Sequence, residues 1–352
     1  MDAQNTVKKP KVTKETKNKI RVDFERTPLK ERLKAKFGTA YIYQKVLISI
    51  FRLVLLIGLS YIVLFPFISK IASSFMGMND FVDATVRLIP KDFTLNIYKA
   101  VFTELDYWKA FANVFTLSLI SALLQTFSCC VIAYGFAKFK FKGNGILFML
   151  VMLTMIIPHS TLKLSMFQNF KDFDIFGIFG LLSKVGILSE DFAYGIRLTN
   201  TYWPLVILSA CGLAFKNGLY IFMLRQFFKG VPDELEESAY IDGSGIFRTF
   251  FTIIIPLSVP MLITVFLFAF SWQWTDNYYM PLFFPSGRIW DWSDVISEIP
   301  ISLKTDYAGA TLFYQAIHNT AGMMAIAPLI VLYLFCQKFL VQGIERSGLT
   351  AD

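Results

Sequence analysis

The sequence predicts an all-α protein with six transmembrane helices, and two observations carry this prediction. Of the 352 residues, 55% are hydrophobic and only 17% are charged, whereas soluble domains carry about 25% charged residues. The charged residues also leave six long uncharged stretches, and roughly 20 apolar residues are enough for a helix to cross a bilayer. This composition disfavours a soluble enzyme, a disordered chain and a disulfide-stapled scaffold. We therefore expect a lipid bilayer to surround most of the chain.

The uncharged stretches give the predicted spans in chain order. They are Leu53–Ser69 (17 residues), Ala110–Ala137 (28), Gly143–Leu162 (20), Leu198–Phe215 (18), Thr249–Thr275 (27) and Tyr307–Gln337 (31). The fourth stretch is short for a span, and we expect its helix to continue past Lys216 to Arg225.

The distribution of positive charge predicts which side of the membrane each loop faces. Residues 1–40 hold 12 basic and 5 acidic side chains, and the Lys138–Lys142 link holds three lysines and no acid. Because Lys and Arg in short loops stay in the cytoplasm, both termini are expected there. The expected domains are a basic tail over 1–44, a transmembrane domain over 45–343 and a C-terminal tail over 344–352.

The basic tail also accounts for almost all of the net charge of +8. The rest of the chain has 22 basic against 21 acidic residues, so we expect no nucleic-acid partner. Two interpretations of the tail stay open. It is attracted to anionic lipid headgroups, or it is a solvated segment that only sets topology. A cleaved signal peptide is not expected, because about 40 polar residues precede the first apolar run, and a signal places its apolar run within the first 15–30 residues.

No catalytic or metal-binding constellation is visible. The four cysteines all lie in predicted spans, and the two histidines, His159 and His318, are far apart in the sequence. The chain contains no phosphate-binding loop, no dinucleotide-binding glycine motif and no nucleophile elbow. We therefore expect no catalytic residue, no metal and no enzymatic activity. Such a chain forms a pathway that takes its energy from elsewhere.

A few residues are candidates for lining that pathway. Lys216 is the one charge near the middle of a predicted span, where it either meets solute or pairs with a neighbouring carboxylate or carbonyl. The end of the fifth span holds aromatic and amide side chains that suit the C–H faces and hydroxyls of a sugar; they are Trp272, Trp274, Asn277 and Tyr278. An interfacial aromatic belt is the alternative interpretation of this group.

The loop over 229–256, between the fourth and fifth spans, is the most informative segment. Pro232 suits the first turn of a helix, and the acidic residues after it favour the helix's positive end. Leu235, Ala239 and Ile241 are expected to give this helix an apolar face, and Gly243 ends it because glycine readily adopts a left-handed conformation.

A second short helix is expected over 246–255, stopping at Pro256 before the fifth span. The two helices would lie on the cytoplasmic face of the membrane. The acidity of this loop, at a place where positive charge is usual, indicates that it docks onto another protein.

The same loop resembles the signature of ABC-importer permease subunits, E-A-A-x3-G-x9-I-x-L-P. With every spacing kept, the matching positions are Glu237, Ser238, Ala239, Gly243, Ile253, Ile255 and Pro256. Ser238 replaces the middle alanine and Ile255 the leucine. Flanking segments resemble the carbohydrate-uptake branch, with the second permease of maltose-type importers, over about residues 45–350. The outer loop Asp172–Arg197 is longer than usual in that family.

The resemblance implies a type I ABC-importer permease fold in the bacterial plasma membrane. It implies a permease subunit of an ATP-driven, binding-protein-dependent importer for a carbohydrate. Its implied partners are a cytoplasmic ABC ATPase dimer, a second homologous permease and an extracellular solute-binding protein. ATP would bind the ATPase, so this chain needs no cofactor of its own. By position, Glu237 would contact a basic group of the ATPase and Gly243 would permit the turn. The other residues of the coupling loop are Leu235, Ser238, Ala239, Asp242, Ile253 and Pro256.

Two alternatives to a carbohydrate importer stay open. An ABC permease for amino acids, peptides or metals shares the loop signature but usually lacks the flanking segments. An ion-coupled carrier works without an ATPase, and it usually needs midplane ionisable groups or a repeated pair of broken helices.

Overall fold

The computed structural model describes residues 40–175, 177–187, 189, 195–285 and 289–348. In these residues the secondary structure is helical, apart from isolated bridges between Met76 and Phe93 and between Phe173 and Ile196. The chain divides into two compact units, Met1–Ser69 and Lys70–Asp352. The fold is therefore all-α, as the composition predicts.

The described part of the first unit is a single apolar helix. Helix α2 covers Ala40–Ser73, and its portion Tyr43–Ser73 is long and apolar enough to cross a membrane. It contains the first predicted span. The predicted basic tail lies outside the described residues up to position 39, so its topological role stays a prediction.

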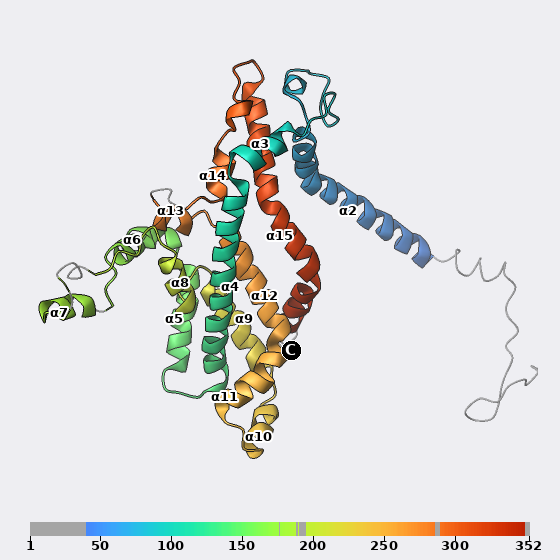
Figure 1. The fold of residues 1–352 in the computed structure, drawn as a ribbon. Coiled ribbons are helices and arrows are strands. Elements are labelled where there is room, and N and C mark those ends of the chain that lie inside the picture. Colours follow the sequence, from blue (N-terminus) through green and yellow to red (C-terminus); the bar gives the residue numbers. More distant parts are fainter. Residues whose placement is uncertain (1–39, 176, 188, 190–194, 286–288, 349–352) are drawn as a thin grey trace, which may run out of the picture. The chain divides into compact units, whose positions relative to one another are not determined.

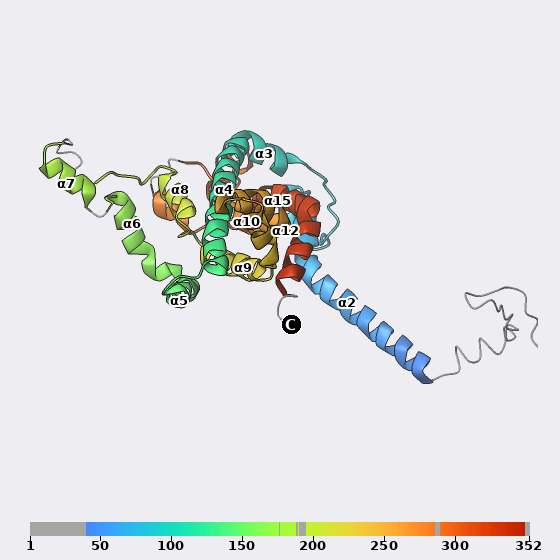
Figure 2. The same cartoon turned by 90° about the horizontal axis from the view of Figure 1, so that it is seen from below.

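The second unit is built around three long helices (Figure 1), which are α4 (Tyr107–Lys138), α12 (Ile255–Trp274) and α15 (Ala310–Gly348). Helix α4 packs against α12, α9 (Asn217–Lys229) and α8 (Trp203–Ala210), and α12 packs against α15. Seen from below, α4, α9, α12 and α15 gather in one bundle (Figure 2). The largest fully buried side chains of this bundle include Tyr220, Phe228, Leu224, Ile254, Met261, Val265 and Ile317.

Two aromatic residues inside the bundle form hydrogen bonds across helices. Tyr107 donates its hydroxyl to the Met324 carbonyl at 3.0 Å, and Trp274 donates its indole N–H to the Ala325 carbonyl at 2.9 Å. An unpaired polar group would cost free energy in an apolar core. These bonds therefore fix both α4 and α12 against α15.

Shorter helices complete the second unit. They are η1 (Met78–Phe81), α3 (Asn96–Glu104), α5 (Asn144–Ile156), η2 (His159–Leu162), α6 (Lys163–Lys171), α7 (Ile178–Lys184), α13 (Tyr279–Phe283), α14 (Trp292–Ser297) and η5 (Ile301–Leu303). The long outer loop contains α7, and part of that loop lies outside the described residues.

The described residues contain four helices that are long and apolar enough to cross a membrane, or five if one bent pair counts as a span. The bent pair joins Asn144–Ile156 to His159–Lys171 at 94°. The fourth predicted span is two helices, α8 and α9, interrupted at residues 211–216. A multi-pass membrane protein is thus confirmed, whereas the count of six spans and the orientation of the termini stay predictions.

The loop between α9 and α12 differs from expectation at its second helix. Helix α10 covers Glu234–Ile241 and α11 covers Ile246–Thr249. A π-helical turn, η4 (Phe250–Ile254), then joins α11 directly to α12. The expected stop at Pro256 is wrong, because the helical backbone continues from the π-helical turn through this proline into α12.

Candidate functional site

The segment of residues 230–249, called here the α10–α11 hairpin, turns sharply at Gly243. This glycine has a φ of 81°, and the Gly243 N–H donates to the Tyr240 carbonyl at 3.0 Å. The Ser244 N–H donates to the Ala239 carbonyl at 2.9 Å. These bonds satisfy carbonyls at the end of α10. The predicted helix end at Gly243 is confirmed.

The hairpin is held against the end of α4 by Lys138. The Lys138 ammonium donates to the Asp233 carboxylate at 2.6 Å and to the Val231 carbonyl at 2.7 Å, and it lies 3.7 Å from the Glu236 carboxylate. Tyr134 donates its hydroxyl to Glu236 at 3.4 Å. The hydrogen bond from Lys138 lowers the pKa of Asp233.

The neighbouring glutamates Glu236 and Glu237 of α10 differ in exposure. Glu236 is buried, together with Ala239, on the side of α10 that faces its own chain. Glu237 is exposed, as are Ser238 and Asp242. Of the two glutamates, Glu237 is thus the one that a docking partner can reach.

Apolar side chains are also exposed on the hairpin. Ile241 is 86% exposed, Phe247 81% and Leu235 42%. Exposed apolar residues beside free carboxylates are typical of a surface that meets another protein. Of the predicted apolar face, Leu235 and Ile241 are accessible, whereas Ala239 is buried.

The last two residues of the predicted coupling loop lie beyond the hairpin. Ile253 is half-buried in the π-helical turn, and Pro256 is exposed in the first turn of α12. The docking role of the whole set is not tested by its placement and stays a prediction.

A second candidate region lies where two predicted spans are interrupted. The bent pair breaks between α5 and α6 next to His159, and α8 and α9 are separated by residues 211–216. Gly212 and Lys216 both have positive φ, 72° and 67°. The rings of His159 and Phe215 lie 4.6 Å apart, so the two breaks meet.

A cavity of about 930 Å³ opens at these breaks, lined by residues that include His159, Asn169, Phe215, Lys216 and Asn217. Irregular backbone at membrane depth is tolerated where it is buried in protein or lines a water-filled cavity. The cavity therefore accounts for the interrupted backbone between α5 and α6 and between α8 and α9.

Lys216 and Trp272, two predicted residues from different predicted spans, meet beside this cavity. The Lys216 ammonium lies 5.1 Å from the ring centroid of Trp272 and 4.7 Å from that of Phe215. Of the two roles left open for Lys216, pairing with a carboxylate is not seen among the described residues. Instead, aromatic faces stabilise its charge.

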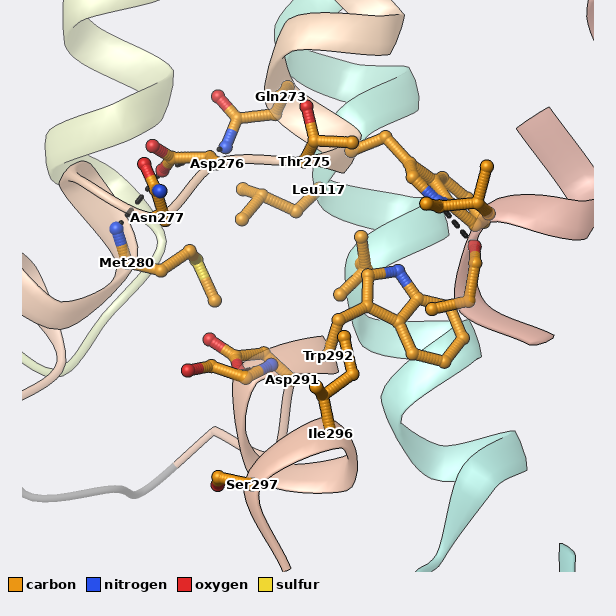
Figure 3. Close-up of a pocket in the computed structure, with 15 residues that line it drawn as sticks. Leu117, Gln273, Thr275, Asp276, Asn277, Met280, Asp291, Trp292, Ile296 and Ser297 are labelled. Carbon is orange, nitrogen blue, oxygen red and sulfur yellow. Dashed lines mark hydrogen bonds between the residues drawn. The ribbon is translucent and has the colours of Figure 1, made fainter. Parts of the chain in front are cut away.

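The chain after α12 forms a smaller polar rim (Figure 3). Asp276 accepts backbone N–H groups from Tyr278 at 3.0 Å, Tyr279 at 3.1 Å and Met280 at 3.0 Å. Burial raises the pKa of Asp276, and these donors oppose that effect. Gln273, Thr275, Asp276 and Asn277 lie on one side of a cavity of about 330 Å³, and Asp291, Trp292, Ile296 and Ser297 lie on the other.

The remaining substrate-path candidates differ in accessibility. Asn277 is exposed, and it lines a cavity of about 100 Å³ together with Trp272 and Tyr278. Tyr278 donates its hydroxyl to the His159 carbonyl at 2.5 Å. Trp274 is only 3% exposed and forms part of the helical core. Trp272, Asn277, Tyr278 and Lys216 thus gather in one region, whereas Trp274 lies in the packing behind it.

The sequence alone did not mark Asn217, Asp276 or Lys138. Asn217 follows Lys216 directly and Asp276 follows the fifth predicted span, so a charge or amide next to a span end was the available signal. The Lys138 contact joins residues 95 positions apart, and nothing in a single sequence marks it. Within the described residues, no three His, Cys, Asp or Glu side chains are grouped to hold a metal ion.

Residues 130–346 match the family described as "Binding-protein-dependent transport system inner membrane component". The chain belongs to this family. The α10–α11 hairpin and the cavity at the helix breaks both lie inside the matched region. The family is a membrane transport component and not an enzyme.

Known relatives of this transport component share most of its length. The arabinooligosaccharides transport system permease protein AraQ of Halalkalibacterium halodurans is 26% identical over 293 residues, with 82% of this chain and 92% of the relative covered. Among solved structures, a chain of a bacterial ABC transporter that imports the acidic polysaccharide alginate superposes with a TM-score of 0.58 at 20% identity, over 89% of this chain and 99% of that chain. A chain of bacterial alginate ABC transporter in complex with an alginate pentasaccharide-bound periplasmic protein gives a TM-score of 0.55 at 16% identity, over 88% and 95%.

Proposed function

We propose that this permease is one membrane half of an ATP-driven importer for carbohydrates in the bacterial plasma membrane. Its relative AraQ belongs to an arabinooligosaccharide transport system, and the two solved neighbours belong to an alginate transporter. These cargoes differ in the sugars that compose them, but all are saccharide chains. A saccharide chain is therefore the solute class that the relatives support.

The α10–α11 hairpin is the observation that carries the proposal. It projects from the ends of α4, α9 and α12 (Figure 1), and it presents the exposed Glu237 beside the exposed Ile241 and Phe247. A separate cytoplasmic ATPase dimer would bind this surface. The charge of Glu237 would meet a basic group there, and a charge-assisted hydrogen bond is worth about 1.5–3 kcal/mol.

The other parts of the proposed importer are separate chains. ATP would bind the ATPase, so the permease itself needs no cofactor. A second, homologous permease would complete the pathway, and an extracellular solute-binding protein would deliver the solute. The hairpin would then lie in the cytoplasm with both termini, and the two-part helices α5–α6 and α8–α9 would complete a set of six spans.

Co-purification tests the proposal directly. The tagged chain would be isolated in mild detergent from its native membrane, and its companions would be identified by mass spectrometry. We expect an ATPase and a second permease in the preparation. The purified assembly with its binding protein should take up an oligosaccharide into liposomes only when ATP is supplied.

Two results would contradict the proposal in different ways. A chain that purifies alone and moves solute without ATP would be an ion-coupled carrier. An assembly with an ATPase that imports amino acids, peptides or metals, but no saccharide, would be an ABC permease for another solute class.

A further inference from the structure

The segment after the third predicted span has no role in the proposed function. Residues 163–175 and 177–187 of this segment, called here the outer arm, contain α6 and α7. Helix α6 belongs to the stretch His159–Lys171, which lies at 94° to α5. Because α5 is part of a predicted span, a helix at right angles to it runs along the bilayer rather than through it.

The base of the outer arm is fixed to the rest of the second unit. Phe170 is buried, and its ring centroid lies 5.2 Å from that of Phe283 in α13. Phe173 and Ile196 exchange backbone hydrogen bonds of 2.9 and 3.0 Å, so the chain leaves and returns at one place. Gly195 has a φ of 91°, and a Cβ there would lie 2.6 Å from the Phe173 carbonyl oxygen. The base is therefore closely packed and requires glycine.

Helix α7 is stabilised by a residue of the arm itself. Asp174 accepts the backbone N–H groups of Phe179 at 2.8 Å and Gly180 at 3.0 Å. These are two of the donors that the start of a helix leaves without a helical partner. The arm therefore presents α7 through its own local contacts.

An aliphatic stripe runs along α7. Ile178, Leu181 and Val185 follow one another at spacings of three and four residues, which places them on one helix face. They are 47%, 63% and 66% exposed. Both views show α7 away from the bundle of α4, α9, α12 and α15 (Figures 1 and 2). Because exposure of large aliphatic side chains to water is unfavourable, an apolar surrounding should cover this stripe.

Three observations favour lipid acyl chains as that surrounding. The arm is attached at both ends to predicted spans, which keeps it next to the bilayer. The stripe consists of Ile, Leu and Val, whereas the cores of protein interfaces are enriched in aromatic residues, Met and Arg. Helix α5, from which the arm continues, exposes the same kind of surface through Ile146, Leu153 and Ile156.

We propose that the outer arm lies in the outer leaflet of the bilayer, with Ile178, Leu181 and Val185 among the acyl chains. Amphipathic helices occupy the membrane interface in this way. The exposed Lys184 at the end of α7 would reach the lipid phosphates, as lysines at such depths do. Residues 172–175 of the arm line the cavity at the helix breaks, so the lipid contact would anchor one wall of that cavity. This inference goes beyond the proposed function and does not depend on the solute.

The test measures the depth of α7 in the complete importer, held in nanodiscs of phosphatidylethanolamine and phosphatidylglycerol. A nitroxide label is attached at Leu181→Cys in a background with Cys211→Ser and Cys336→Ser, in which the two buried cysteines remain. We expect the label to collide more often with oxygen, which concentrates in the bilayer, than with a water-soluble nickel chelate. A label at Lys304→Cys, an exposed position of another predicted outer loop, should show the reverse order.

A matched pair of charges makes the result specific to the stripe. With the label at Val185→Cys, addition of Leu181→Glu should raise collisions with the nickel chelate, because a charge is expelled from the acyl region. Ser189→Glu, at an exposed position of the same outer loop outside the stripe, should leave them unchanged. If the labelled chains do not assemble, photoreactive diazirine phospholipids applied to the unmodified importer should crosslink within residues 178–187.

Several outcomes would overturn the inference. A label at Leu181→Cys that meets the nickel chelate more often than oxygen would place α7 in water. Protection from both reagents would mean that the second permease or the binding protein covers the stripe instead of lipid. Diazirine crosslinks on other segments but not within residues 178–187 would also contradict lipid contact. Each of these results leaves carbohydrate import intact, and because no readout requires transport, failure of the proposed function would not alter them.

Discussion

The Lys138 ammonium at the end of α4 lies 2.6 Å from the Asp233 carboxylate at the start of α10, 95 residues further along the chain. Only 7% of the Lys138 side chain is exposed, whereas 78% of the Asp233 side chain is. The same ammonium lies 3.7 Å from the buried Glu236. One lysine of the core bundle therefore holds the hairpin through a neighbouring carbonyl and two carboxylates.

Replacing Lys138 with Met should loosen the hairpin. The buried carboxylate of Glu236 would lose its nearest positive charge, and an unsatisfied buried polar group costs about 1–3 kcal/mol, or more when it is charged. We expect faster amide hydrogen exchange in α10 and weaker transport, with membrane insertion unchanged. Lys138→Arg, which keeps the charge, should behave nearly like the wild type. Wild-type exchange rates in Lys138→Met would rule out this anchoring role.

The Lys138–Asp233 contact should also make the hairpin sensitive to acid. In the folded protein the pKa of Asp233 lies below its ordinary value of 3.8. Its contribution is therefore complete at neutral pH and disappears as the pH falls below that value, through the lowered folded pKa. Exchange of α10 amides, corrected for intrinsic rates, should rise as the pH falls below about 4. The variant Asp233→Asn should not show this rise.

Reversing the charge of Glu237 should abolish ATP-driven uptake without harming the fold. Glu237 is exposed, so Glu237→Lys breaks no internal contact but presents the wrong charge to a partner. Uptake and ATP hydrolysis would be measured in the reconstituted assembly. Lys142→Glu, a reversal at another exposed position in the loop between α4 and α5, should have little effect. Full uptake in Glu237→Lys would remove this residue from the docking surface.

Substitution of Gly243 separates backbone strain from crowding. A Cβ at this position would meet no heavy atom within 4 Å, but the φ of 81° is unfavourable for most side chains. Gly243→Val should cost about 1–2 kcal/mol from the left-handed backbone alone and should impair uptake. Gly243→Asn should be tolerated better, because asparagine adopts this conformation more readily. Equal uptake by the two variants would show that the turn does not control coupling.

The crossing of α15 and α12 depends on Gly343. A Cβ there would overlap the Thr264 hydroxyl and would lie 3.2 Å from the Pro260 carbonyl. Gly343→Ala should therefore lower the melting temperature of the purified protein, since overpacking costs about 1–3 kcal/mol. Gly322→Ala on the same helix has open space and should be neutral or stabilising. If both substitutions have the same effect on melting, close packing at Gly343 is not required.

Local signals in the sequence predicted much of the fold and of the hairpin. Uncharged stretches located α4, α12 and α15, and Pro232 and Gly243 bounded α10 because both residues restrict the backbone locally. The same local reasoning failed at Pro256. A proline does not by itself end a helix: Pro256 follows the π-helical turn, Pro260 lies inside α12, and the helical backbone continues past both.

The interrupted helices were harder to foresee. Counting charges treats Leu198–Phe215 as one stretch, because the break at residues 211–216 contains no charge before Lys216. Gly212 was the one local signal, and glycine is also common inside membrane helices. The meeting of Lys216 with Trp272 depends on how two distant spans pack, which no local pattern records.

The π-helical turn at Phe250–Ile254 joins α11 and α12 into one continuous helix. The helix runs without a loop over the 29 residues from Ile246 to Trp274, a length of about 43 Å at 1.5 Å per residue. A tilt of about 5° at the hairpin end would therefore move the far end, which carries Trp272, by about 4 Å. A displacement of that size is comparable to the spacing between a bound sugar and the ring it stacks on. Under the proposed function, a small rotation at the hairpin would therefore change the contact of Trp272 with the solute.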